Sequence, residues 1–468
     1  MRAMPAKRRG VQMRRIKENT KAAALLIFAA GGMLRLFYVC FSTIYDRQYD
    51  IGLIDLDAGH TVTGGHLAYI QYLYENWRMP DFDPTSVYQF HHPPLHHFLC
   101  AVWMKFVSLF IKNTAVVEES IQAIPFVCSL LILWVLLRIV RQFDLQERTV
   151  RYLMALFAFH PALVLLSGSV NNDCLALLFT LLCVFYAIEW GRAPSMGCIA
   201  KLALVLGLGM MTKQSVAEMA FPIGAVFLYV LLVRIREGGL WGKSVKDLAR
   251  QFGIFGLISV PLGMWFYVRN LLRYQVSFLW VYELPEDSWQ YTGNVSVVNR
   301  FLWPIPQEMV DNLKNFRIGC GYNVWMQIIR TSVLGEWDMA GVGKPVKLLA
   351  VFLMLLGGIL ALAALVSFVW TFGITVRVKR MDPPSWLLCV AGYLVTMIGY
   401  FIFAYKFPQQ CSMHFRYIEI TLLFPALGLG FVLQEQKNRW LNWTAWGILG
   451  CFGVCSVLMT GVWCLGVG

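Results

Sequence analysis

The sequence predicts an all-α membrane protein that crosses the bilayer about eleven times. Of its 468 residues, 58% are hydrophobic and only 14% are charged, whereas a soluble domain carries roughly 25% charged residues. Apolar runs recur along the chain with lengths near the ~20 residues that span a hydrocarbon core of ~30 Å. Lys and Arg concentrate in short loops between these runs, so the net charge of +13 indicates membrane orientation rather than nucleic-acid binding.

Residues 1–21 are predicted to form a basic cytoplasmic tail, because they hold eight Lys or Arg and the apolar run that follows lacks an A-x-A cleavage pattern. That run is therefore interpreted as a retained first span. Twelve apolar segments are candidates for spans, at about 22–44, 95–110, 119–138, 152–168, 175–190, 198–213, 217–233, 252–268, 346–375, 384–405, 416–433 and 440–465.

One of the twelve segments, 95–110, is predicted to lie on the outer surface instead of crossing. If it crossed, the basic loop 138–151 and every later basic loop would fall outside, against the positive-inside rule. The segment is also short and carries His96, His97 and Lys105, which an interfacial helix tolerates better than a spanning one. Eleven spans remain, with the N-terminus inside and the C-terminus outside.

The predicted organisation has four parts. After the tail comes an N-terminal transmembrane module, 22–269, which includes a large exterior loop, 45–118. A second exterior loop, 270–345, is rich in Trp, Tyr and Pro and precedes the C-terminal helices of 346–468. Within the first loop, apolar residues from His66 to Trp77 recur every three or four positions, which predicts an amphipathic surface helix that ends before Pro80.

The stretch YQFHHPPLHHF, residues 88–98, raises the question of a metal site. Histidines four apart on a helix can bind zinc, but Pro93 and Pro94 disfavour helix just before them, so His92 and His96 are not expected to share a turn. The prolines suit the first turn of an exterior helix. His96 and His97 then lie within that helix, one of them toward the headgroups, and only His92 remains a chemical candidate. No CxxC or Cys/His zinc spacing occurs among the twelve cysteines.

The predicted topology gathers ionisable residues from distant parts of the chain at the exterior face. Charged groups in or near a membrane are costly, so function is their default interpretation. Three of these residues also have a structural explanation: Asp173 as a helix cap, Lys213 as a side chain that extends to the headgroups, and Arg269 as a contact with lipid phosphate. The residues are Asp50, His92, Asp173, Lys213, Arg269, His414 and Arg416.

Carboxylates among several cations predict an anionic, phosphate-bearing substrate together with a base. Cations neutralise a phosphate leaving group, while a carboxylate takes the proton from an attacking hydroxyl. No Walker loop or GxGxxG is present, so ATP and dinucleotides are not expected.

At these residues the chain resembles GT-C glycosyltransferases, namely the dolichyl-phosphate-mannose protein mannosyltransferases and the related bacterial aminoarabinose transferases. The resemblance covers most of residues 20–270 plus one late motif. Its points of match are Asp50 after the first span, HPPL at 92–95, NNDCLALLFTLL at 171–182, GLGMMTK at 207–213 and FRYI at 415–418.

The resemblance implies roles for individual residues. Asp50 is the expected base, which deprotonates the acceptor hydroxyl; Asp173 helps hold the acceptor or a metal. Lys213 is expected to contact the lipid phosphate, with Arg269, His414 and Arg416 as weaker candidates and His92 in a cationic or hydrogen-bonding role nearby. Family members carry an Asp-Glu pair where Ile51 follows Asp50 here, so Asp55 and Asp57 remain rivals for the base.

The predicted function is transfer of a sugar, with inversion, from a polyprenyl-phosphate donor to an acceptor hydroxyl at the exterior face of a bacterial plasma membrane. The alternative is a transporter or flippase of lipid-linked glycans, but such proteins place ionisable residues near the midplane and often show inverted repeats. No cofactor is required by the resemblance, and a divalent metal is left open. The sugar and the acceptor, whether protein, lipid or wall glycan, are left open too.

Overall fold

The computed structural model describes residues 6–45, 64–239, 242–278, 280–303, 321–336, 342–374 and 381–466. These ranges contain helices and loops and no named β-strand. The helices are α1 (Ala6–Phe41), α2 (His66–Asn76), α3 (Leu95–Ser108), α4 (Thr114–Glu119), α5 (Ala123–Val140), α6 (Glu147–Ala158), α7 (Pro161–Leu165), α8 (Asp173–Arg192), α9 (Met196–Met210), α10 (Ala220–Gly238), α11 (Lys243–Tyr274), α12 (Val297–Phe301), α14 (Val324–Leu334), α15 (Lys344–Phe368), α16 (Pro383–Lys406), α17 (Leu423–Glu435) and α18 (Arg439–Leu465).

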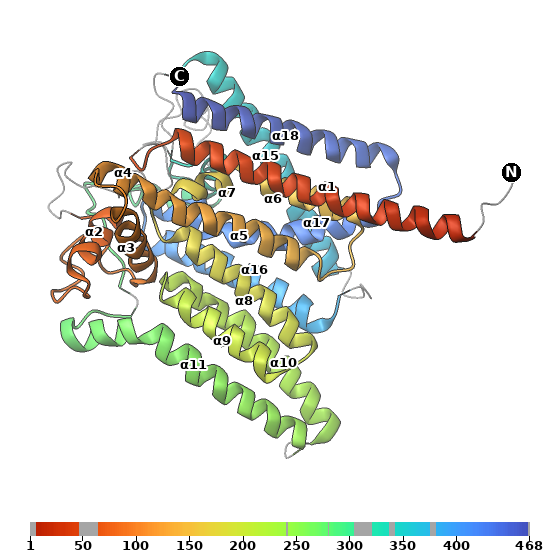
Figure 1. Ribbon diagram of the computed structural model, residues 1–468, viewed down its shortest axis with the longest axis horizontal. Coiled ribbons are helices and arrows are strands. Elements are labelled where there is room, and N and C mark those ends of the chain that lie inside the picture. Colours follow the sequence, from red (N-terminus) through yellow and green to blue (C-terminus); the bar gives the residue numbers. More distant parts are fainter. Residues whose placement is uncertain are drawn as a thin grey trace.

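The long apolar helices lie side by side and form a bundle (Figure 1). In the described part of the chain, eight helices are long and apolar enough to span a membrane, and the bent pair α6 and α7 makes a ninth if it counts as one span. This confirms the predicted all-α, multi-pass class. Each of the eleven predicted crossings contains one of these helices or the shorter α9 or α17. The exact number of crossings stays a prediction.

The direction of the chain fits an odd number of crossings. Helix α1 begins at one end of the bundle, whereas α18 ends near the other, which is the end that carries α2, α3 and α4 (Figure 1).

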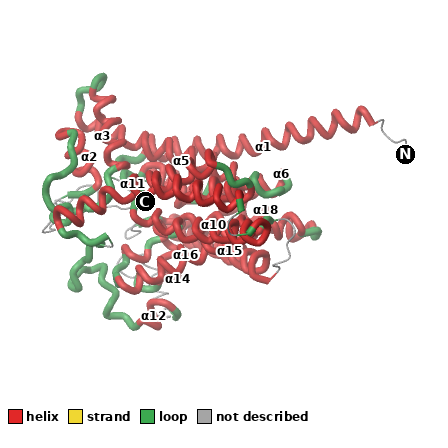
Figure 2. Tube along the Cα trace, turned by 90° about the horizontal axis from the view of Figure 1, so that it is seen from below, coloured by secondary structure: helices red, strands yellow, loops and turns green. Residues whose placement is uncertain are grey.

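The segment predicted to lie outside the membrane is α3, and it sits beside α2 at one end of the bundle (Figures 1 and 2). These two helices and α4 share a small apolar core of their own, built on Tyr69, Ile70, Cys100 and Met104. The amphipathic helix predicted from His66 corresponds to α2, which buries Tyr69, Ile70 and Leu73. It ends at Asn76, with Trp77 in the left-handed conformation (φ 52°), ahead of Pro80.

One detail of the prediction is wrong. His96 and His97 are both fully buried, so neither points to the headgroups. The reason is that α3 packs on α2 on one side, and His96 Nε2 lies 3.1 Å from the Val170 carbonyl on the other.

A fully buried arginine in α1 has a structural role. Arg35 donates from Nε to Ser129 Oγ (2.8 Å) and from Nη1 to the Gly31 and Ala158 carbonyls (2.9 and 2.8 Å). The close approach of α1 to α6 requires Gly31, because a Cβ there would lie 2.7 Å from Ala158 Cβ. This charge is thus satisfied by neighbouring helices and is not part of a site.

The predicted sidedness can be tested at opposite ends of the bundle. In a variant in which all twelve cysteines are replaced by Ser, a cysteine at Ser86, between α2 and α3, is expected to react with a membrane-impermeant maleimide in intact cells. A cysteine at Lys243, where α11 begins, is expected to react only after permeabilisation, because the basic loops are predicted to face the cytoplasm. The reverse pattern would show that the topology is inverted.

Candidate functional site

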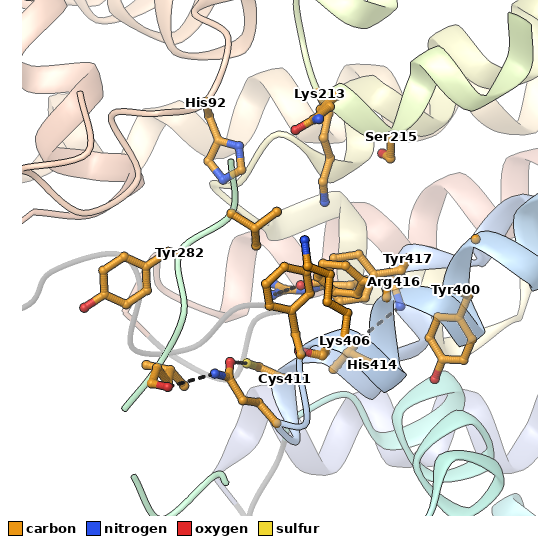
Figure 3. Close-up of a pocket in the computed structure, with 18 of the residues that line it drawn as sticks. His92, Lys213, Ser215, Tyr282, Tyr400, Lys406, Cys411, His414, Arg416 and Tyr417 are labelled. Atoms are coloured by element: carbon orange, nitrogen blue, oxygen red, sulfur yellow. Dashed lines mark hydrogen bonds between the residues drawn. The ribbon is translucent and has the colours of Figure 1, made fainter. Parts of the chain in front are cut away.

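A cavity of about 780 Å³ lies at the bundle end that carries α2 and α3, where its lining includes His66 and the loop 88–93. Its walls come from residues far apart in the sequence. They are the His-Pro loop (88–93), the 3₁₀ turn after α9 (Gln214–Met219), the loop 280–290, α14, one face of α16 and the segment 407–417. Four of the predicted site residues line the cavity, namely His92, Lys213, His414 and Arg416. Figure 3 labels all four of them, together with Lys406 and Tyr417.

Asp173 forms the centre of the charged group behind this wall. It is the first residue of α8, where the helix dipole favours a carboxylate. Its side chain is 3% exposed and forms an ion pair with Lys213, which is 13% exposed and follows α9. The neighbouring Asn172 donates to the Thr212 carbonyl at 2.9 Å, which fixes the start of α8 against the end of α9. The pair therefore joins two helix ends.

Arg416 brings a second cation to the same carboxylate. Its Nη1 lies 4.0 Å from Asp173 Oδ2, and its Nη2 donates to Tyr417 Oη at 3.1 Å. The Tyr417 ring also contacts Lys213, whose Nζ lies 5.0 Å from the ring centroid. Two cations, one carboxylate and one aromatic ring thus form a unit, of which Lys213, Arg416 and Tyr417 line the cavity.

His414 reaches the cavity from the same short segment. Its Nδ1 accepts a hydrogen bond from the backbone N–H of Arg416 at 3.0 Å, so a neutral ring carries its proton on Nε2. That Nε2 lies 3.8 Å from a carboxylate oxygen of Glu336, which also lines the cavity. The contact orients the His414 ring within the wall.

His92 belongs to a stack of imidazole rings. Its ring lies 4.2 Å from the His91 ring and 5.5 Å from the His66 ring, centroid to centroid, and His66 Nδ1 lies 2.9 Å from His97 Nε2. Burial, together with the neighbouring histidines, lowers the pKa of His92 well below its usual value, and burial lowers that of His91 to about 3. Both rings are neutral at pH 7, which favours hydrogen bonding over the cationic role that was the other option for His92.

Of the remaining two predicted residues, Arg269 lies elsewhere and Asp50 is outside the described residues. Arg269 is not among the cavity residues of the described chain: its guanidinium donates to the Pro80 carbonyl and, at 2.9 Å, to Asn270 Oδ1. It thus fastens the loop after α2 to the end of α11. Asp50 and its rivals Asp55 and Asp57 lie outside the described residues.

Three kinds of cavity residue were missed by the sequence reasoning. Lys406 ends α16 one residue beyond the predicted span 384–405, where it resembles an ordinary terminal lysine. Trp280 and Tyr282 belong to a loop without periodicity, within the stretch 270–345 that is rich in Trp and Tyr. Arg330 lies on α14, within a stretch interpreted only as a folded exterior loop.

Among the residues the structure describes, no three His, Cys, Asp or Glu side chains are grouped so that they could hold a metal ion. The histidines at 91–97 stack on one another and on Tyr69 instead of converging on a point.

A comparison with protein families matches residues 91–267 to the family described as dolichyl-phosphate-mannose-protein mannosyltransferase. The match covers fewer than half of the 468 residues and includes His92, Asp173 and Lys213, but not Asp50, Arg269, His414 or Arg416. It confirms the resemblance seen in the sequence, and it supports a glycosyltransferase. No curated protein matches the sequence.

Two solved structures are similar over most of the chain. ArnT from Cupriavidus metallidurans bound to undecaprenyl phosphate has 14% identity and a TM-score of 0.42, with 94% of this chain and 77% of that one covered. The oligosaccharyltransferase AglB from Archaeoglobus fulgidus, in complex with an inhibitory peptide and a dolichol-phosphate, has 13% identity and a TM-score of 0.44. Here 94% of this chain corresponds to 55% of AglB, so the chain spans about half of that protein.

The ion pair between Asp173 and Lys213 predicts a coupling energy that can be measured. Asp173→Asn and Lys213→Gln are each expected to destabilise the protein, by at most about 3–5 kcal/mol, because each removes one partner of a largely enclosed ion pair. The double variant is expected to lose less than the sum of the two. Chemical unfolding in detergent micelles measures all four proteins, and strictly additive losses would contradict the pairing.

Proposed function

We propose that this protein is an inverting glycosyltransferase that moves a sugar from a polyprenyl-phosphate donor to an acceptor hydroxyl. The reaction takes place at the exterior face of a bacterial plasma membrane. The observation that carries the proposal is the composition of the cavity, which combines cations at the end of the bundle with an apolar wall at the lipid-facing surface. A ligand that suits both has an anionic head and a hydrocarbon tail.

The charged end of the cavity fits a phosphate. Lys213 and Arg416 line it together, and Tyr417 lies against both cations. Asp173 holds the two cations in place from behind without entering the cavity lining. Preorganised cations of this kind stabilise negative charge without reorganisation during a reaction.

The apolar wall fits a hydrocarbon chain. Phe221 on α10 and Ile402 on α16 both line the cavity, yet their side chains are 70% and 62% exposed on a protein whose long helices face lipid. Between them, Gly399 leaves room for the Glu218 side chain, whose carboxylate would lie 3.1 Å from a Cβ at that position. The cavity therefore extends to the outer surface of the bundle between α10 and α16.

In the proposed reaction each of these residues has a role. Asp50 takes the proton of the acceptor hydroxyl, whose oxygen attacks the anomeric carbon from the face opposite the phosphate. The bond between that carbon and the phosphate oxygen breaks, and Lys213 and Arg416 stabilise the departing phosphate. Neutral His92, which lines the same cavity, donates a hydrogen bond to the donor near its phosphate. Asp55 and Asp57 are the rivals of Asp50 as the base.

A transporter of lipid-linked glycans is not favoured by any observation in the site. Transporters bind their substrates near the bilayer midplane. The ionisable residues Lys213, His414 and Arg416 lie instead at one end of the bundle, beside the juxtamembrane helices.

A transfer assay tests the proposal. The purified protein in lipid vesicles is given a synthetic polyprenyl-phosphate hexose as donor and envelope extracts as the source of acceptors. Lys213→Gln and Arg416→Gln are each expected to lower the rate by about 10²–10³, because each removes a cation from the leaving phosphate. Asp50→Asn is expected to lower it by about 10²–10⁴, since the base is lost. The initial rate of radiolabel transfer measures each effect.

The matched control is Arg273→Gln, because Arg273 is exposed near the end of α11 and does not line the cavity. Its rate is expected to equal that of the unmodified protein. Full activity of Asp50→Asn, with loss in Asp55→Asn or Asp57→Asn, would move the base to one of the rivals. Absence of transfer with every polyprenyl-phosphate sugar tried would contradict the function.

A further inference from the structure

Lys406 lies in the last turn of α16, on the face that lines the cavity. Thr396, Gly399, Phe403 and Lys406 follow one another at intervals of three or four residues, and all four line the cavity. This spacing places them on one side of a helix. Lys406 and the adjacent Tyr405 are both exposed, but only Lys406 lines the cavity, so α16 presents Lys406 to the cavity and Tyr405 away from it.

This orientation separates Lys406 from an ordinary terminal lysine. A cation in the last turn of a helix complements the helix dipole, and a lysine at a membrane surface often extends along apolar side chains to the headgroups. Both explanations place the ammonium outside the protein. Figure 3 shows Lys406 drawn across the cavity from Lys213, beside Arg416 and Tyr417.

The charge of Lys406 is not balanced by a carboxylate in the described residues. Its ammonium lies 5.1 Å from the centroid of the Phe407 ring, and no ion pair or hydrogen bond of its side chain occurs there. Lys213 and Arg416, by contrast, share the carboxylate of Asp173. The other charged residues that line the cavity are one cation, Arg330, and two carboxylates, Glu218 and Glu336, and none of them forms an ion pair with Lys406 in the described residues.

The proposed reaction creates a charge that fits this arrangement. A polyprenyl-phosphate sugar is a phosphodiester with one negative charge. When the bond between the anomeric carbon and oxygen breaks, its electron pair stays on the phosphate, and the leaving group gains a second negative charge. The proton released by the acceptor goes to the base. A cation whose charge is not already shared with a carboxylate gains most from the second charge.

We propose that Lys406 is a catalytic residue that binds the leaving phosphate and stabilises the negative charge that develops on it. The inference rests on the proposed function and deepens it. Lys213 and Arg416 hold the phosphate in donor and product, whereas Lys406 acts on the charge that distinguishes the two. Lys406 thus contributes more to the transition state and to the product than to the bound donor.

The test compares Lys406→Gln with the unmodified protein in two assays, using a synthetic polyprenyl-phosphate hexose and the free polyprenyl phosphate. In the transfer assay, kcat is expected to fall by about 10–100-fold while KM for the donor changes by less than about twofold, because the effect is confined to the developing charge. In a competition binding assay, the unmodified protein is expected to prefer the free phosphate over the phosphodiester. In the variant, the ratio of the affinity for the free phosphate to the affinity for the phosphodiester is expected to be about tenfold smaller.

Two further variants make the result specific. Lys406→Arg keeps the charge and is expected to restore kcat to within about fivefold of the unmodified protein. Lys112→Gln, at an exposed lysine beyond α3 and away from the cavity lining, is expected to change neither assay. Thermal unfolding in the same vesicles shows whether the variants are folded.

Outcomes that overturn the inference differ from those that overturn the function. If the unmodified protein transfers the sugar and Lys213→Gln does not, but Lys406→Gln keeps full kcat or only raises KM, the function stands and the role of Lys406 is wrong. If Lys406→Gln loses activity and Lys406→Arg does so equally, the charge is not what matters and the inference is also wrong. If the unmodified protein transfers nothing, both fall together.

Discussion

The structure of the site depends on one buried carboxylate. Asp173 is almost completely enclosed, and an isolated charge in such surroundings would be very costly. It is tolerated because α8 begins there, Lys213 pairs with it and Arg416 approaches it from the segment before α17. Three separate stretches of the chain must meet for this to happen. The charge requirement therefore fixes the geometry of the wall that faces the cavity.

The same constraint explains how a rigid site can bind an anion at a membrane surface. Two cations near one carboxylate leave an excess of positive charge, and the carboxylate keeps them from repelling each other. Burial lowers the pKa of His91 and His92 beside them, so these two rings add hydrogen-bonding groups without adding further charge. Positive charge is thus concentrated at Lys213, Arg416 and Lys406, at the end of the bundle, while Phe221 and Ile402 extend the cavity toward lipid.

The sequence predicted where residues lie along the membrane normal better than it predicted which way they point. Helix ends follow from apolar run lengths, so Asp173, Lys213 and Arg416 could be assigned to one end, and loop charges removed α3 from the bundle. Arg269 lies at a comparable position but turns to the Pro80 carbonyl, and no periodicity in the sequence gives that direction. His96 and His97 are buried because α3 packs on α2, which is a tertiary contact. Lys406 was missed because a lysine after an apolar run is normal at a membrane surface.

The central claim is that the Asp173–Lys213–Arg416 unit holds the phosphate of a polyprenyl carrier. An experimental structure of the protein in lipid nanodiscs with a polyprenyl phosphate tests it most directly. We expect phosphate density within hydrogen-bond distance of Lys213 and Arg416, with the hydrocarbon chain leaving between α10 and α16 along Phe221 and Ile402. Phosphate density bound to a different group of residues, with this cavity filled only by water, would contradict it.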